Sequence, residues 1–132
     1  ARPDPGHFTS NAKTSDKILW MSADQFFLIE EKAGSSAAAI KSKLADKAYV
    51  SDQSDSWVIV SLSGARALDA LERICAVNLH PDVFKPGQAA RTQMEHLGTI
   101  ILRAGEQEWL LMGARSSSHS FLHAITQSAK NI

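Results

Sequence analysis

Hydrophobic residues fall into short runs along this chain, and the first two runs predict a β-hairpin. Residues 18–21 and 26–29 are apolar and include several aromatic side chains, and a short polar turn separates them. Both runs are continuous rather than alternating between apolar and polar positions. We therefore expect both faces of the hairpin to be covered.

Apolar residues then recur at helical spacing, which predicts a helix. Its inward positions would be Ala37, Ile40, Leu44 and Ala48. Lys41, Lys43 and Lys47 lie off that face and near the end of the helix, where the helix dipole favours cations. This arrangement is typical of a solvated helix surface.

The rest of the chain alternates between strands, helices and one irregular segment. Residues 57–62 are β-branched and apolar on both faces, which makes them the clearest strand, and a helix follows the turn at Ser63 and Gly64. Residues 78–87 contain two prolines and a glycine, which prevent a regular element. The remaining predicted elements are strands at 90–94, 99–103 and 108–112 and a closing helix at 117–129.

The order of these elements favours an α+β fold with a mainly antiparallel sheet and packed helices, with room for two small lobes.

Residues 1–16 are polar, contain two prolines and hold one strong hydrophobe, Phe8. They predict a flexible N-terminal arm, and the alternative is an arm that orders on a partner with Phe8 as its anchor. Residues 17–132 would then form the folded domain.

Composition narrows the class of protein. The chain has 132 residues, 14 basic and 14 acidic side chains and one cysteine. A net charge of zero argues against a nucleic-acid partner held by electrostatics. One cysteine excludes an internal disulfide framework or a multi-cysteine metal site. No apolar stretch reaches the ~20 residues that cross a bilayer, so we expect a cytoplasmic protein without a membrane partner.

Two histidines, His119 and His123, are the strongest metal candidates, because they lie four residues apart on the closing helix. Zinc proteases use this spacing, but they place a glutamate after the first histidine, where this chain has Ser120. Surface histidines and no metal are therefore expected.

The single thiol, Cys75, lies on the inner face of a predicted helix and is expected to be a small buried hydrophobe rather than a nucleophile.

The turn at Ser63, Gly64 and Arg66 follows a strand and opens a helix, where an anion can bind backbone N–H groups. With Arg91 nearby, these residues form a weak candidate for a folate or other anion site. They lack the further glycines of a dinucleotide-binding loop, so a simple strand-to-helix turn is the competing interpretation. The sequence offers no catalytic residues.

Four segments together resemble the gamma subunit family of heterotetrameric sarcosine oxidase. Residues 57–71 resemble that family's strand, LSGP.A..VL motif and helix, although Ala65 replaces the usual proline. Residues 75–92 resemble its C..DLHP..F.PG..A.T segment. Residues 19–28 resemble its W.GPDEWLL hairpin, which also occurs in aminomethyltransferase-like domains, and residues 115–122 resemble its final helix.

The resemblance implies an aminomethyltransferase-like fold and a non-catalytic structural subunit. The family's complex converts sarcosine to glycine and passes the one-carbon unit to tetrahydrofolate. It carries FAD, FMN and NAD on larger subunits, so we expect no cofactor on this chain and alpha, beta and delta subunits as partners. The candidate partner contacts are Phe8, Leu79, Val83 and Phe84.

Two alternatives remain at this point. One is the equivalent subunit of an N-methylglutamate dehydrogenase-type complex. The other is a stand-alone folate- or anion-binding module of the aminomethyltransferase superfamily.

Overall fold

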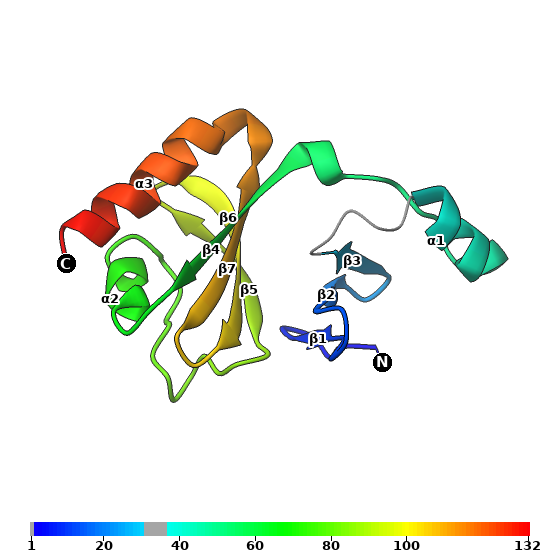
Figure 1. The fold of residues 1–132 in the computed structure, drawn as a ribbon, viewed down its shortest axis with the longest axis horizontal. Coiled ribbons are helices and arrows are strands. Elements are labelled where there is room, and N and C mark those ends of the chain that lie inside the picture. Colours follow the sequence, from blue (N-terminus) through cyan, green and yellow to red (C-terminus); the bar gives the residue numbers. More distant parts are fainter. Residues whose placement is uncertain (1, 31–36) are drawn as a thin grey trace.

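A computed structural model describes residues 2–30 and 37–132, and it contains two antiparallel sheets (Figure 1). The N-terminal sheet consists of β1 (Phe8–Ser10), β2 (Lys17–Ser22) and β3 (Gln25–Ile29), in that order. Strands β2 and β3 form the hairpin that the sequence predicts. This sheet holds Leu19 opposite Phe27 and Trp20 opposite Phe26.

The central sheet has the strand order β4-β7-β6-β5, so β4 and β5 are its edges. Its strands are β4 (Trp57–Ser63), β5 (Ala89–Met94), β6 (Leu97–Gly105) and β7 (Glu108–Ala114). All its pairs are antiparallel. The α+β prediction and the mainly antiparallel sheet are therefore confirmed.

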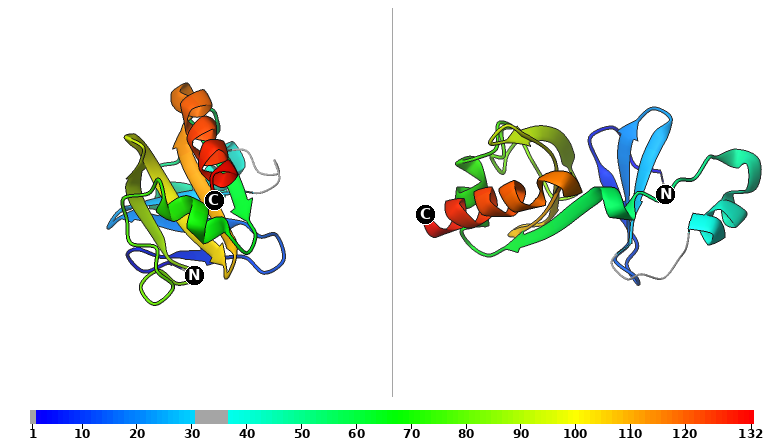
Figure 2. Two further views of the ribbon diagram at one scale, coloured as in Figure 1. Left: turned by 90° about the vertical axis from the view of Figure 1, so that its left-hand side faces the viewer. Right: turned by 90° about the horizontal axis from the view of Figure 1, so that it is seen from above.

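Three α-helices occur in the described part, at α1 (Ala37–Leu44), α2 (Ala67–Glu72) and α3 (Ser118–Lys130). Short 3-10 turns occupy Ala45–Lys47, Ser54–Ser56 and Arg115–Ser117. Helices α2 and α3 lie together on one side of the central sheet, whereas α1 stands apart from both sheets (Figures 1 and 2). No helix in residues 2–30 or 37–132 is long and apolar enough to cross a membrane.

Two hydrophobic clusters join these parts into three layers. The first cluster lies between the central sheet and α2, α3 and the irregular segment, and includes Leu71, Ile101 and Phe121. The second lies between the two sheets, where Leu19 of β2 packs with Ile100 and related residues of the central sheet. The central sheet is therefore covered on both faces along β6 and β7, which explains the continuous apolar run of β6, whereas Ile59 of edge strand β4 is 46% exposed.

The N-terminal sheet is covered on one face only. Leu19 and Met21 of β2 are buried against the central sheet, while Ile18 and Trp20 on the opposite face are half-buried. Leu28, which pairs with Ile18, is 45% exposed. The expectation that both faces of the hairpin are covered is therefore wrong for the described residues of this chain.

The segment predicted as a flexible arm contains an ordered strand. Phe8 in β1 pairs with Leu19 and is only 8% exposed. Its backbone N–H donates to the carbonyl of Gly87 at 2.9 Å, and the N–H of Ala89 donates to the carbonyl of Gly6 at 2.8 Å. A single large apolar side chain between the sheets orders this segment, so a boundary after residue 16 does not match the strand pairing.

The helix expected around residues 37–48 forms, but not as an inner element. It ends as an α-helix at Leu44, which is 37% exposed, and Ala48 is exposed beyond it. Ile40 is half-buried, and the side chain of Ala37 lies outside the described ones. Among the described residues the predicted inward face therefore has no core to face, because α1 stands apart from both sheets (Figure 1).

Candidate functional site

The four candidate anion-binding residues do not converge. Ser63 ends edge strand β4, whereas Arg91 lies on β5 at the opposite edge of the central sheet. Three strand spacings separate these edges, which amounts to about 14 Å. The Arg66 guanidinium instead lies 3.2 Å from the Asp69 carboxylate one turn along α2. These residues do not form one site for the anionic group of a folate.

Gly64 has a structural role in the turn between β4 and α2. Its φ of +131° lies in a region that side chains disfavour. Its N–H donates to the carbonyl of Gln107 at 2.9 Å, and its carbonyl accepts from Ala67 at 3.2 Å. The backbone at Gly64 is therefore engaged in joining β4 to α2, which supports the strand-to-helix interpretation.

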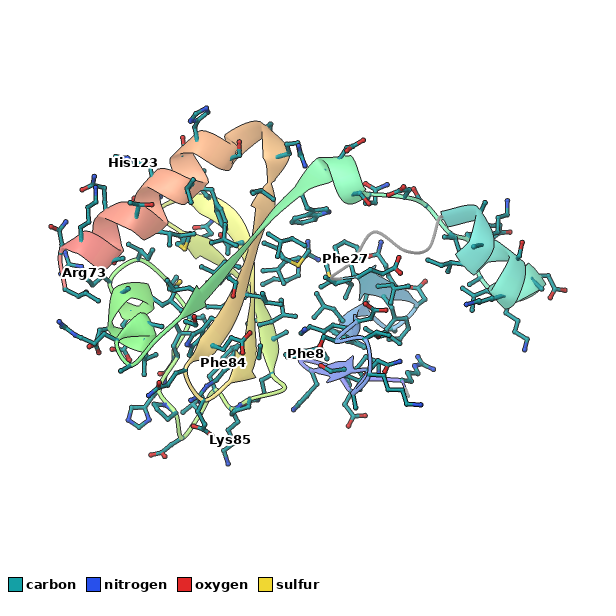
Figure 3. All side chains as sticks on the ribbon, in the orientation of Figure 1. Phe8, Phe27, Arg73, Phe84, Lys85 and His123 are labelled. Carbon is teal, nitrogen blue, oxygen red and sulfur yellow. The ribbon has the colours of Figure 1, made fainter. Side chains whose placement is uncertain are left out.

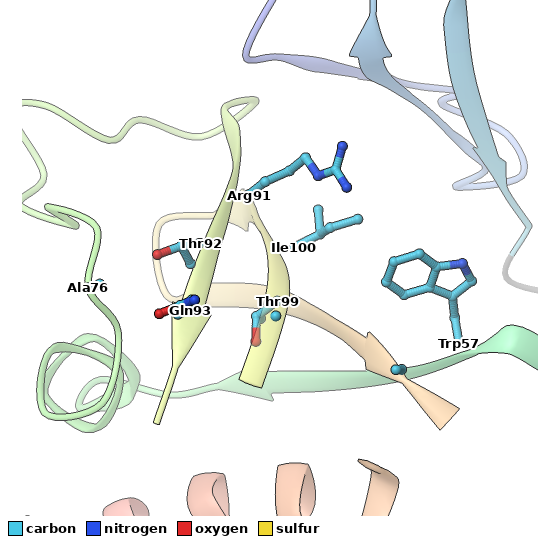
Figure 4. A pocket seen from close by; sticks show the side chains of 9 residues that line it. Trp57, Ala76, Arg91, Thr92, Gln93, Thr99 and Ile100 are labelled. Atoms are coloured by element: carbon cyan, nitrogen blue, oxygen red, sulfur yellow. The ribbon is translucent and has the colours of Figure 1, made fainter. Parts of the chain in front are cut away.

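Two hollows lie near the candidate residues. The larger has a volume of about 680 Å³ and is lined by residues that include Trp57, Arg91 and Ile100. Figure 4 shows the Arg91 side chain and the Trp57 indole on either side of Ile100. The smaller hollow has a volume of about 250 Å³ and lies where Gly64 and Pro81 approach Arg103.

Arg103 is the most extensively bonded side chain at the smaller hollow, and it is only 4% exposed. Its guanidinium donates to the carbonyl of Phe84 at 2.6 Å and to that of Gly105 at 3.2 Å. A further nitrogen donates to the carbonyl of Glu106 at 2.9 Å and lies 3.3 Å from its carboxylate. Charge-assisted bonds of this kind compensate a buried guanidinium for lost water.

Two aromatic rings complete the surroundings of Arg103. Its guanidinium carbon lies 5.2 Å from the centre of the Trp109 ring, and Trp109 is directly opposite Arg103 in the sheet. The Phe84 and Trp109 rings are 5.7 Å apart. Trp109 Nε1 is buried without a hydrogen-bond partner in the described part of the chain. This cluster holds the irregular segment against β6 and β7 rather than presenting reactive groups.

The two histidines of the candidate metal pair lie on the surface of α3. His119 and His123 are both exposed on α3, and Figure 3 shows His123 on the outside of that helix. Residues 2–30 and 37–132 contain no group of three or more potential metal-ligating side chains. Burial raises the pKa of the Cys75 thiol to about 11, so the thiol is protonated at neutral pH.

Three of the four proposed partner contacts belong to the chain's own core. Phe8, Leu79 and Phe84 are only 8%, 1% and 5% exposed. Irregular segments with large hydrophobes often bind partners, but here these hydrophobes attach the segments to the chain's own sheets. Val83, at 56% exposed, is the one of the four that faces solvent.

The sequence matches one protein family over nearly its whole length. The family model described as "Sarcosine oxidase, gamma subunit family" covers residues 4–131. The chain belongs to the sarcosine oxidase gamma subunit family. The resemblance inferred from the four motif segments is thereby confirmed.

Curated members of the gamma subunit family are similar to this chain in sequence. The chain is 29% identical over 107 residues to the sarcosine oxidase subunit gamma of Corynebacterium sp. (strain P-1), covering 80% of this chain and 53% of that protein. It is 26% identical over 125 residues to that of Arthrobacter sp., covering 91% of this chain and 62% of the relative. The chain therefore spans between half and two thirds of the length of these relatives.

A solved structure shows the same fold. A chain of the heterotetrameric sarcosine oxidase from Corynebacterium sp. U-96, in complex with pyrrole 2-carboxylate, superposes with a TM-score of 0.85 at 23% identity. The match covers 96% of this chain and 65% of that one. At this identity the likeness establishes the fold.

The segment that most specifically resembles the gamma family folds around Arg103. The N–H groups of Val83 and Phe84 both donate to the carbonyl of His80, at 2.9 and 2.8 Å. Gly87, with a φ of +91°, donates its N–H to the carbonyl of Arg103 at 2.9 Å. The family-like pattern here therefore specifies packing and a turn.

Sequence reasoning missed the role of Arg103, which is not among the candidate site residues. The available signal was its position inside an otherwise apolar strand, between Leu102 and Ala104. An arginine at a buried strand position needs several acceptors. The irregular segment and the β6–β7 turn supply them.

Proposed function

We propose that this chain is a non-catalytic structural subunit of a sarcosine oxidase-type heterotetrameric flavoenzyme complex. The observation that carries the proposal is the family match over residues 4–131. Its curated relatives bear the name sarcosine oxidase subunit gamma, and the similar solved chain comes from a heterotetramer. The alpha, beta and delta subunits would be its partners, and the cytoplasm its location.

In this proposal the chemistry belongs to the larger subunits. They would demethylate sarcosine oxidatively to glycine with FAD, FMN and NAD, and transfer the one-carbon unit to tetrahydrofolate. The separation of Ser63 from Arg91 supports the assignment of folate to another subunit. The Arg66 guanidinium is occupied by Asp69, which supports it further.

Co-expression with the alpha, beta and delta subunits tests the proposal. The chain should co-elute with them in size-exclusion chromatography, and sarcosine-dependent hydrogen peroxide should form with the complex but not with the chain alone. A chain that stays monomeric beside these subunits, or that oxidises sarcosine by itself, would contradict it. Faster turnover of N-methylglutamate than of sarcosine would favour the N-methylglutamate dehydrogenase-type complex.

Two measurements address folate binding by the chain itself. Calorimetric titration of the isolated chain with tetrahydrofolate should give no binding heat at high micromolar ligand. The variants Ser63→Ala and Arg91→Ala should leave the activity of the assembled complex unchanged. Saturable heat that disappears in Arg91→Ala would instead support a folate-binding module.

A further inference from the structure

Helix α1 and the turn after it form a segment without a core. Every described residue from 38 to 49 is exposed or half-buried, and Tyr49 has its whole side chain in solvent. The two ribbon views that show α1 in profile place it beyond the N-terminal sheet, away from the central sheet and its helices (Figures 1 and 2). This segment, residues 38–49, is here named the α1 arm.

The length of α1 makes this isolation significant. The helix has eight residues, whereas helices without tertiary packing are only marginally stable in water below about 12–15 residues. Packing of an apolar face supplies most of the stability of helices in proteins. A helix of this length therefore needs a surface to pack against, and the described part of this chain does not provide one.

The residues of α1 indicate what that surface is like. Ile40 and Leu44 are four positions apart, so they lie about 40° from each other around the helix axis. Lys41 lies about 60° beyond Leu44 on one side, and Lys43 lies about 60° beyond Ile40 on the other. The helix thus carries an apolar stripe with a lysine along each side.

The α1 arm as a whole carries a net positive charge, as do the two sides of its apolar stripe. Its lysines are Lys41, Lys43 and Lys47, and its one acidic residue is Asp46. None of the three lysines forms an ion pair with another described residue of the chain. A matching surface would have an apolar floor for Ile40 and Leu44 and acidic rims for the lysines on either side.

We infer that the α1 arm docks into an apolar groove with acidic rims on a larger subunit of the complex, and that α1 becomes stably helical on binding. The inference rests on the proposed function, because that function supplies the partner. It replaces the interpretation of the lysines as a solvated surface: the lysines flank an apolar stripe that the described residues of the chain leave only partly covered.

Hydrogen–deuterium exchange of the full chain, free and in the co-expressed complex, tests the folding step. Peptides that cover the α1 arm should exchange rapidly in the free chain and at least about tenfold more slowly in the complex. Equal protection in both states would overturn the inference. Strong protection in the free chain would also overturn it, because α1 would then pack within the chain or in a dimer.

Matched variants test the contacts. Ile40→Ser with Leu44→Ser should weaken binding to the larger subunits by about tenfold or more, whereas Leu122→Ser on the exposed side of α3 should not. Lys41→Glu with Lys43→Glu should also weaken binding and remove its salt dependence. The control Lys85→Glu with Lys130→Glu makes the same change of charge at exposed sites outside the arm.

The outcomes separate the two proposals. Loss of binding in the arm variants alone supports the docking role. Unchanged binding in the arm variants, with the wild type still in the complex, overturns the docking role and leaves the proposed function standing. A wild-type chain that does not join the larger subunits contradicts the proposed function and the docking role together.

Discussion

The central sheet and the N-terminal sheet differ in how far the chain itself covers them. The central sheet has helices on one face and the N-terminal sheet on the other, and Ile101, Leu102 and Leu111 are completely buried in it. The N-terminal sheet packs on one face, and Leu28 on its other face is half-exposed. The first region is a self-contained core, whereas in the second region the described residues leave one face of the sheet and the α1 arm only partly covered.

The region of the molecule that is most deeply buried also contains the buried polar hydrogen bonds. In the central region Arg103 bonds to three backbone carbonyls, and Ser128 of α3 donates to the carbonyl of Ala70 in α2 at 2.5 Å. Such bonds order the irregular segment and fix one helix against the other. The α1 arm has exposed lysines in their place, so its position depends on what it meets outside the chain.

Removing the Arg103 guanidinium should give the largest effect on the central region. Arg103→Ala leaves the carbonyls of Phe84, Gly105 and Glu106 without their donor and exposes a cavity beside Trp109. We expect the free energy of unfolding to fall by about 3 kcal/mol or more in urea titrations. Arg91→Ala, at an exposed position on β5, should change it by less than about 0.5 kcal/mol. Equal effects of the two variants would show that the Arg103 bonds are not decisive.

Crowding the contact between β7 and α3 should have the next largest effect. An ideal Cβ at Gly113 would lie 2.7 Å from Cδ1 of Phe121, which is 1% exposed and has little room to move. Gly113→Ala should therefore lower the free energy of unfolding by about 1–3 kcal/mol. At Gly98 the same atom would meet nothing within 4 Å, so Gly98→Ala serves as the control. An unchanged free energy of unfolding in Gly113→Ala would mean that α3 can shift on the sheet at little cost.

The coupling between the two regions can be measured directly. Phe27 of the N-terminal sheet and Trp57 of β4 meet edge to face, with ring centres 5.6 Å apart. A double-mutant cycle of Phe27→Ala and Trp57→Ala should give a coupling of about 1 kcal/mol in chemical unfolding. The pair Leu28→Ala and Trp57→Ala should be additive, because Leu28 faces away from the central sheet. If the effects of Phe27→Ala and Trp57→Ala on the free energy of unfolding were additive, the two sheets would not be coupled through this contact.

Changes in the α1 arm should have the smallest effect on the chain alone. Ile40→Ser with Leu44→Ser should change the free energy of unfolding of the isolated chain by less than about 0.5 kcal/mol, because neither side chain is in a core. Leu71→Ser, at a fully buried position of α2, should destabilise it severely. A large loss in the arm variant would place α1 in the self-contained core and remove the contrast between the regions.

Much of the local structure could be predicted from the spacing of apolar residues. The hairpin at β2 and β3, the strand at β4 and the closing helix α3 all occur where periodicity predicts them, because each pattern spans only a few neighbouring residues. The burial of Phe8 could not be predicted from the spacing of apolar residues. Its polar surroundings in the sequence predict disorder, yet pairing with Leu19 buries it.

The candidate site was less predictable than the fold. The sequence is compatible with an anion site that contains both Ser63 and Arg91, but the order of strands places them at opposite edges of the sheet. Arg103 gave little local signal, because the bond from its guanidinium to the carbonyl of Phe84 joins residues 19 positions apart, although its other two carbonyl acceptors lie in the adjacent turn at Gly105 and Glu106. Such groupings depend on contacts between distant residues.

The positions of most strands and helices, the gamma subunit family, the turn at Gly64 and the irregular segment at residues 78–87 could all be inferred from the sequence alone. These features depend on neighbouring residues or on motifs that can be read along the chain. The three-dimensional arrangement was needed to show that Leu79 and Phe84 are core residues, that Arg103 is a structural centre and that α1 joins no core of the described residues. The physical reason is that periodicity shows which face of an element is apolar, whereas burial depends on which other surface comes to cover that face.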